Sequence, residues 1–336
     1  MSEPVPLDNL PNSEEENADL TYFAFAKAVA APRGVLASEA RTVELPDVLV
    51  GRYRLERLLG AGGMGVVYRA RDLLHEQYGD PEPYVALKML GEELAESPDA
   101  SALLYSEFAL TRRLHHPNVL RLHSFEVDIC CRRAFFTMEL MRGVTLDRLF
   151  CDRPLGLSWP ELRDIALPLL DALAHAHRRG VLHGDLKPSN VMVCEDGVRL
   201  FDFGLGQSVK GVMPGLAQLS RNRFNAWTPG YAAPELLEGQ PLSTSTDVYA
   251  VACVLYELAG GKHPFRRLPS TRAREERLDR ELLVPRSLPK HCWPALRAAL
   301  SFDASQRTLT IQELYDAFSR QPSWLRYWPA RVGKNL

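Results

Sequence analysis

Two short runs near the middle of the sequence gather residue types that suit phosphate chemistry. The first, residues 181–192, is VLHGDLKPSNVM and contains Asp185, Lys187 and Asn190. The second, residues 200–204, is LFDFG and contains Asp202. Carboxylate and amide oxygens can hold Mg²⁺, and lysines can neutralise phosphate oxygens, which is what a phosphoryl-transfer transition state requires. The two runs therefore indicate phosphoryl transfer.

A glycine cluster near residue 60 is the second signal. Alone it is weak, because G-x-G-x-x-G also marks dinucleotide-binding folds, in which a helix follows the glycines. Here residues 66–69 (VVYR) continue as a strand, which favours a hairpin. Its backbone N–H groups can lie over a triphosphate without obstruction by Cβ atoms. The cluster consists of Gly60, Ala61, Gly62, Gly63, Met64 and Gly65.

A lysine and a glutamate form the third signal. Residues 85–88 (VALK) end a predicted strand with Lys88, which in such a motif reaches the α- and β-phosphates. This lysine requires a carboxylate from a helix to hold it. Glu107 lies in the predicted helix at residues 101–114, before the HHPNV run at residues 115–119. We therefore expect an ion pair between Lys88 and Glu107.

Together these motifs resemble the Hanks-type, or eukaryotic-like, serine/threonine protein kinases, most closely their bacterial members. The resemblance covers about residues 52–320. In that family the aspartate matching Asp185 orients and deprotonates the attacking hydroxyl, while the residues matching Asn190 and Asp202 hold two Mg²⁺ ions, a role that Mn²⁺ can also fill. Lys187, within DLKPSN, is expected to contact the γ-phosphate and is typical of serine/threonine specificity. The resemblance implies ATP-dependent phosphorylation of a protein substrate in signal transduction, with Lys88 completing the catalytic set.

The same resemblance predicts an adenine pocket. Val67 and Ala86 cover the base from above, Met192 lies below it, and Met138 is the gatekeeper at the back. Residues 136–141 are expected to form the hinge between the lobes, with main-chain groups of Glu139 and Met141 hydrogen-bonded to the base. The predicted pocket comprises Val67, Ala86, Met138, Glu139, Met141 and Met192.

Residues 228–235 (TPGYAAPE) resemble the end of a kinase activation segment. The resemblance places Thr228 beside the catalytic aspartate and lysine. It also pairs Arg307 with Glu235, the acid of the A-P-E motif. These contacts would build the platform on which a peptide docks.

Two further residues are expected to support the catalytic loop. Asp247 matches the buried aspartate that holds the loop backbone in the family. His183 titrates near neutrality and so invites a catalytic interpretation. By resemblance, however, it is structural and lies close to Phe203.

The sequence departs from the family pattern at two positions. Gly184 stands where an arginine usually precedes the catalytic aspartate. Because that arginine normally receives a phosphate on the activation segment, we expect this control to be missing. Trp227 stands where glycine usually precedes the threonine.

Two other functions are compatible with part of this pattern. Small-molecule phosphotransferases share the H-G-D-x-x-x-x-N pattern, but they lack the glycine-rich loop and the A-P-E segment. An ATP-binding pseudokinase scaffold would carry out no transfer. Loss of one of four residues would favour the scaffold, yet all four are present: Lys88, Asp185, Asn190 and Asp202.

The elements that position these residues change in character along the chain. Apolar alternation predicts mostly strands before Gly143, and helical spacing predicts mostly helices after it. We therefore expect an α+β, bilobal protein-kinase fold, with a small β-rich N-lobe (about residues 51–139) and a larger helical C-lobe (about 142–320). The predicted strands are 52–59, 66–71, 84–90, 134–140, 191–194 and 198–201, and the predicted helices are 101–114, 159–179, 247–258 and 311–320.

Composition and the ends of the chain complete the prediction. Hydrophobic residues make up 46%, charged residues 24%, and the net charge is −2, which suggests neither a nucleic-acid binder nor a disordered chain. The six cysteines lack zinc-ligand spacing and are interpreted as free thiols. We expect a partly disordered extension at residues 1–50, a kinase domain at 51–320 and a tail at 321–336. The acidic start lacks a signal peptide, and 248–258 is too short to cross a bilayer, so we expect no membrane span and a cytoplasmic location.

Overall fold

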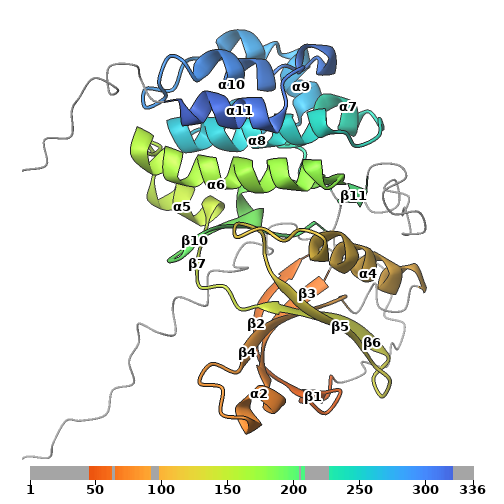
Figure 1. Ribbon diagram of the computed structural model, residues 1–336. Helices are drawn as coiled ribbons and strands as arrows, with labels where there is room; N and C mark the ends of the chain where they lie inside the picture. Colours follow the sequence, from red (N-terminus) through yellow and green to blue (C-terminus); the bar gives the residue numbers. More distant parts are fainter. Residues whose placement is uncertain (1–44, 63–64, 92–97, 204–205, 209–226, 321–336) are drawn as a thin grey trace, which may run out of the picture.

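The chain folds into a smaller lobe built on a curled sheet and a larger lobe built of helices (Figure 1). The computed structural model describes residues 45–62, 65–91, 98–203, 206–208 and 227–320. The lobes join after residue 139, where the sheet ends. The predicted α+β, two-lobed fold is confirmed.

The smaller lobe contains a six-stranded antiparallel sheet in the order β1-β2-β3-β4-β6-β5. Burial alternates along β3, so one face of the sheet packs inward and the other meets solvent. The strands are β1 (Val48–Leu49), β2 (Tyr53–Gly62), β3 (Gly65–Asp72), β4 (Tyr84–Met89), β5 (Leu122–Asp128) and β6 (Arg133–Glu139).

One long helix, α4 (Pro98–Arg112), packs on this sheet. The Phe108 ring lies 5.6 Å from the Phe125 ring and 5.9 Å from the Phe136 ring. This aromatic contact fixes the helix face that carries Glu107. A short helix, α2 (Leu73–Gln77), follows β3 and is capped by the Asp72 carboxylate.

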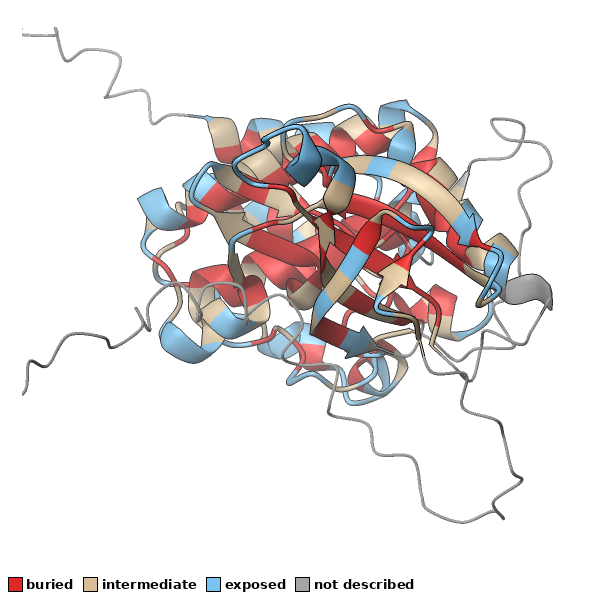
Figure 2. Ribbon diagram, turned by 90° about the horizontal axis from the view of Figure 1, so that it is seen from below, coloured by how far each residue is buried: buried red, intermediate tan, exposed pale blue. Residues whose placement is uncertain are grey.

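The larger lobe is organised around α6 (Trp159–Arg178) and α8 (Thr244–Gly260). A capping box between Ser158 and Glu161 begins α6, and Gly261, with a φ of 69°, ends α8. Residues 248–258 form the predicted buried helix, and buried positions are drawn red in Figure 2. The other helices are α5 (Leu146–Asp152), α7 (Pro234–Leu237), α9 (Ser270–Glu275), α10 (Trp293–Ala299) and α11 (Ile311–Ser319). No helix within the described ranges is long and apolar enough to cross a bilayer.

Two small sheets and a turn frame the loop at residues 183–190. A three-stranded sheet has the order β10-β9-β7, and β8 pairs with β11. The 3₁₀ turn η2 (Pro188–Asn190) leads into β9. The strands are β7 (Gly143–Thr145), β8 (Val181–Leu182), β9 (Val191–Cys194), β10 (Gly197–Leu200) and β11 (Gln207–Ser208).

The sequence did not predict the two edge strands of the large sheet. In β1, Leu49 is fully buried, and the N–H of Val50 donates to Asp128 Oδ2 over 2.7 Å. The ordered sheet therefore begins before residue 51, where the domain was expected to start. With two residues β1 is too short to show alternation, and β5 is only partly buried along most of its length.

Candidate active site

Lys88 joins three elements at the junction of the lobes. It projects from β4, and its Nζ lies 2.6 Å from Glu107 Oε1 on α4. The same Nζ lies 3.0 Å from Asp202 Oδ1, in the segment after β10. The predicted ion pair with Glu107 is confirmed, and Asp202 is an additional partner.

The charges of this cluster are mutually supporting. Burial alone would lower the pKa of Lys88, but the carboxylates of Asp202 and Glu107 outweigh burial and raise it. Burial would likewise raise the pKa of Asp202, yet Lys88 and Lys187 lower it to about 2. For Glu107 burial prevails and its pKa is raised, although Lys88 opposes the shift. Asp202 is therefore an anion throughout the physiological pH range.

Asp185 lies in the loop between β8 and η2, with two donors on its carboxylate. Lys187 Nζ donates to Oδ2 over 2.6 Å, and the N–H of Thr228 donates to Oδ1 over 3.2 Å. Lys187 Nζ also lies 3.1 Å from Thr228 Oγ1. Asn190 Nδ2 donates to the carbonyl of Asp185 over 2.9 Å. The four residues thus form one hydrogen-bonded unit, with Thr228 where it was expected.

The backbone just before Asp185 is bound to a buried carboxylate on α8. The N–H groups of His183 and Gly184 donate to Asp247 Oδ2 and Oδ1, each over 2.9 Å. His177 Nε2 lies 2.9 Å from Asp247 Oδ2. Burial would raise the pKa of Asp247, but the hydrogen bond from His177 and the neighbouring charges lower it. Asp247 supports the loop as predicted.

His183 is structural. Its ring centroid lies 4.7 Å from that of Phe203, and its Nε2 lies 3.1 Å from the carbonyl of Phe201. Its Nδ1 accepts the N–H of Asp185 over 3.3 Å. Burial lowers the pKa of His183, so the ring is neutral, with its proton on Nε2. It therefore links the catalytic loop to the segment that carries Asp202.

The predicted apolar pocket residues lie in one buried cluster. It contains Val67, Ala86, Met138, Met141 and Met192, and β4 pairs with β6 so that Ala86 faces Met138. Glu139 follows Met138 at the end of β6, where its N–H donates to the carbonyl of Arg121 over 3.0 Å. The cluster also contains residues that the sequence analysis did not assign to the pocket, among them Leu59 and Phe201.

The glycine-rich loop forms the predicted hairpin as far as the structure describes it. Gly60 pairs with Val67, and Gly62 pairs with Gly65, across β2 and β3. A Cβ atom on Gly65 would lie 2.3 Å from the carbonyl oxygen of Met89, so only glycine fits there. The other two predicted loop residues, Gly63 and Met64, lie outside the described residues, as do residues 204–205 and 209–226.

The end of the activation segment is tied to the helical lobe. Arg307 Nη2 lies 2.5 Å from Glu235 Oε2, and Arg307 Nη1 donates to the carbonyl of Ser245 over 2.7 Å. The predicted ion pair is confirmed. Tyr231 hydroxyl also lies 2.5 Å from Glu257 Oε2, a contact with no signal in the sequence.

The fold and this site define a protein kinase. Residues 53–317 match the protein kinase domain family, and the chain belongs to that family. Members use ATP with a divalent metal ion to phosphorylate proteins.

The curated relatives include bacterial serine/threonine kinases. The chain is 33% identical over 270 residues to serine/threonine-protein kinase PkaA of Streptomyces coelicolor, covering 76% of this chain and 47% of PkaA. It is 35% identical over 223 residues to serine/threonine-protein kinase pkn3 of Myxococcus xanthus, covering 64% and 38%. It is 33% identical over 221 residues to serine/threonine-protein kinase PknA of Mycobacterium tuberculosis, covering 65% and 48%. The predicted resemblance to bacterial members is confirmed, and the matches span less than half of each of these relatives.

Proposed function

We propose that this chain transfers the γ-phosphoryl group of ATP to serine and threonine hydroxyls of a protein substrate. The observation that carries the proposal is Lys88 Nζ held between Glu107 and Asp202. That contact aligns a strand of one lobe, its helix and a loop of the other lobe. Such alignment is what phosphoryl transfer demands of a protein, because most of the catalysis is positioning and charge stabilisation.

We assign the nucleotide to the space between the glycine-rich hairpin and the apolar cluster. The hairpin residues 60–65 supply backbone N–H groups for the phosphates, and Lys88 supplies a positive charge. The cluster residues enclose the adenine ring. Because the N–H of Glu139 is already bonded to Arg121, we assign the carbonyl of Glu139 and the N–H of Met141 to the base.

The residues Asn190 and Asp202 fit a divalent metal ion. Asp202 is ionised, and the amide nitrogen of Asn190 is used by the carbonyl of Asp185, which leaves its oxygen for a cation. Hard oxygen donors with few carboxylates suit Mg²⁺, and Mn²⁺ accepts the same set. When bound, such an ion neutralises phosphate oxygens of the nucleotide.

The catalytic loop provides the acceptor side of the reaction. Asp185 accepts the proton of the substrate hydroxyl. The oxygen of that hydroxyl bonds to the γ-phosphorus of ATP, and the bond between this phosphorus and the bridging oxygen breaks, so ADP leaves. Lys187 and the N–H of Thr228 hold the Asp185 carboxylate in place. Lys187 also carries positive charge toward the transferred group, since Asp185 and Asp202 raise its pKa against the effect of burial. The Lys187–Thr228 contact supports the serine/threonine assignment.

A transfer assay tests the proposal. Purified protein is incubated with radiolabelled ATP, Mg²⁺ and a generic protein substrate, and phosphoamino acids are then analysed. We expect phosphoserine and phosphothreonine, and a loss of about a thousand-fold or more in Lys88→Met and Asp185→Asn. The exposed residues Lys290 and Asp279 provide matched controls as Lys290→Met and Asp279→Asn. Equal transfer in all four variants would contradict the assigned site, and nucleotide binding without transfer by the wild type would favour a pseudokinase scaffold.

The remaining predictions concern the whole protein. We propose that residues 51–320, with β1 added at the front, act as the catalytic domain, flanked by the extension and the tail. The cytoplasmic location and the lack of a nucleic-acid partner stay predictions.

A further inference from the structure

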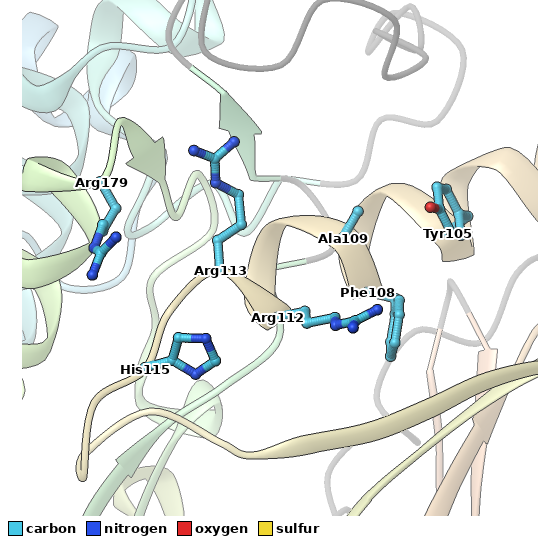
Figure 3. Close-up of a pocket in the computed structure, with 7 residues that line it drawn as sticks. All are labelled: Tyr105, Phe108, Ala109, Arg112, Arg113, His115 and Arg179. Atoms are coloured by element: carbon cyan, nitrogen blue, oxygen red, sulfur yellow. The ribbon is translucent and has the colours of Figure 1, made fainter.

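A basic hollow lies between the C-terminal half of α4 and the end of α6, and none of the predicted site residues lines it. Its volume is about 420 Å³. Figure 3 shows Arg112, Arg113 and His115 lying between Phe108 on α4 and Arg179 beyond α6. The hollow has no acidic lining residue. Its lining consists of Tyr105, Phe108, Ala109, Arg112, Arg113, His115 and Arg179.

Two of these arginines lack an acidic partner in the part of the chain that the structure describes. Arg112 and Arg179 are both exposed, and no described carboxylate lies within ion-pair distance of either. The guanidinium of Arg112 instead lies 5.8 Å from the Phe108 ring centroid. An adjoining hollow of about 540 Å³ shares Arg112 and His115 and is also lined by Arg121, Arg199 and a single acid, Glu139, so cations outnumber acids there too. Like charges gathered in hollows with apolar walls focus a positive potential that attracts anions.

We propose that the acidic segment at residues 14–19 of this same chain binds in the basic hollow. The first twenty residues contain no lysine or arginine, and their acids are Glu3, Asp8, Glu14, Glu15, Glu16 and Asp19. The other end of the chain is excluded as the occupant, because Arg326, Arg331 and Lys334 make it basic.

The chain length permits this contact. The 26 residues from Asp19 to Leu45, where the described structure begins, span up to about 90 Å when extended. The kinase domain has a radius of gyration of only about 19 Å. A tether of this length holds the acidic segment near the domain at about millimolar effective concentration, which is enough for weak pairs of charges to form.

Binding at this hollow would act on the active site through α4. Arg112 follows Glu107 on that helix, whereas Arg179 belongs to the helical lobe. A segment bonded to both ties α4 to the larger lobe and favours the position in which Glu107 meets Lys88. This effect on activity rests on the proposed function, whereas the binding itself does not.

A charge swap tests the effect on activity. We expect kcat/KM to fall about five-fold in Arg112→Glu with Arg179→Glu, and in Glu14→Lys with Glu15→Lys and Glu16→Lys. Combining the two reversed sets should restore activity to within about two-fold of wild type. The exposed pair Lys290→Glu with Arg297→Glu is the matched control and should have no effect. Failure of the combined variant to regain activity would overturn the proposed coupling.

A cross-link tests binding without reference to activity. A carbodiimide should join the amine introduced by Arg112→Lys or Arg179→Lys to a carboxylate at residues 14–19, as identified by mass spectrometry. A mixture of isotopically light and heavy protein distinguishes links within one chain from links between two. Links within one chain support the proposal, and high salt should abolish them. Links only between chains, or none to residues 14–19, would overturn it, even if the wild type were an active kinase.

Discussion

Asp247 and Glu107, the two carboxylates that support the catalytic residues, are held in different ways. Asp247 is buried beneath the catalytic loop and bonds to two backbone N–H groups and to His177. Glu107 is nearly as buried, but among the described residues its side chain bonds to Lys88 alone. The helical lobe therefore fixes its loop through the backbone, whereas the strand-rich lobe presents Lys88 through one ion pair.

This difference indicates where the enzyme can be controlled. The bonds around Asp247 lie inside the core of the larger lobe, so they cannot change without disturbing that core. The Lys88–Glu107 pair depends on how α4 is docked, and a helix can shift as a unit. A partner that contacts α4 can therefore alter activity at little cost to folding, and the basic hollow lies on that helix.

The largest effect is expected for Asp247→Ala. The change leaves two buried N–H groups without an acceptor, at about 1–3 kcal/mol each, so stability should fall by about 4 kcal/mol and activity should be lost. Urea unfolding of this variant beside the exposed control Asp279→Ala measures the difference. A stable, active Asp247→Ala protein would show that the loop does not need this support.

The next effect is expected for Glu107→Gln, and it falls on activity. Lys88 retains Asp202 as a partner, so the buried ammonium is not left without a counter-charge and stability should change less than in Asp247→Ala. A misplaced Lys88 should lower kcat/KM by about a hundred-fold. Measurements of kcat/KM and of urea unfolding on both variants, with exposed Glu275→Gln as control, distinguish the effect in the strand-rich lobe from the effect in the helical lobe. A greater loss of stability here than in Asp247→Ala would invert the comparison.

A smaller effect concerns pH and a buried histidine of the helical lobe. Burial, and next the charge of Arg267, lower the pKa of His263 to about 3, below its ordinary value of 6.5. Between these values the unfolded chain binds more protons than the folded chain, so stability rises with pH and is lost as pH falls below about 6.5. From pH 7 to pH 5 the loss from this group should be about 2 kcal/mol.

His263→Asn should remove this pH dependence. The His263 Nδ1 atom accepts the N–H groups of Phe265 and Arg267, and an asparagine oxygen can replace it as the acceptor. Unfolding curves of both proteins at pH 5, 6 and 7 give the contribution by subtraction, since other titrating groups are common to both. Parallel curves would show that His263 keeps its ordinary pKa in the folded state.

Residues that perform chemistry were the most predictable part of the site. Phosphoryl transfer restricts which side chains can serve, so Lys88, Asp185 and Asp202 stand in recognisable runs. The partner of Lys88 also followed from spacing along one helix. These predictions required only local sequence and a resemblance, and the structure brings the residues together.

Supporting residues were less predictable because their partners are distant in sequence. His177 bonds to Asp247, 70 residues away, and in the sequence it resembles an ordinary cation in the last turn of a helix. Leu59 and Phe201 belong to the same buried cluster as the predicted adenine-pocket residues, yet each is only one more apolar residue in the sequence pattern. Strand β5 lies at a sheet edge, where partial burial weakens alternation.

The smallest effects concern Gly184, which stands where related kinases usually have an arginine. The backbone conformation at this position is a second reason for glycine there. Its φ is 84°, in the left-handed region that favours glycine. An arginine at this position would therefore have to adopt a backbone conformation that is unfavourable for any residue with a Cβ atom. We expect Gly184→Arg to lower stability by about 1 kcal/mol, as measured by urea unfolding, with Gly239→Arg at the exposed glycine of φ 85° as the matched comparison.

Without an arginine before Asp185, activity should not depend on a phosphate in the activation segment. We therefore expect kcat/KM to stay within about two-fold after phosphatase treatment, and in Ser208→Ala with Ser220→Ala, because no charge-assisted hydrogen bond to that arginine is lost. Thr228→Ala should still impair transfer, since the hydroxyl of Thr228 contacts Lys187 directly. If phosphatase silenced the enzyme and incubation with ATP restored it, another cation would be receiving a phosphate. The backbone contacts around Asp247 would then be insufficient to hold the site in its active form.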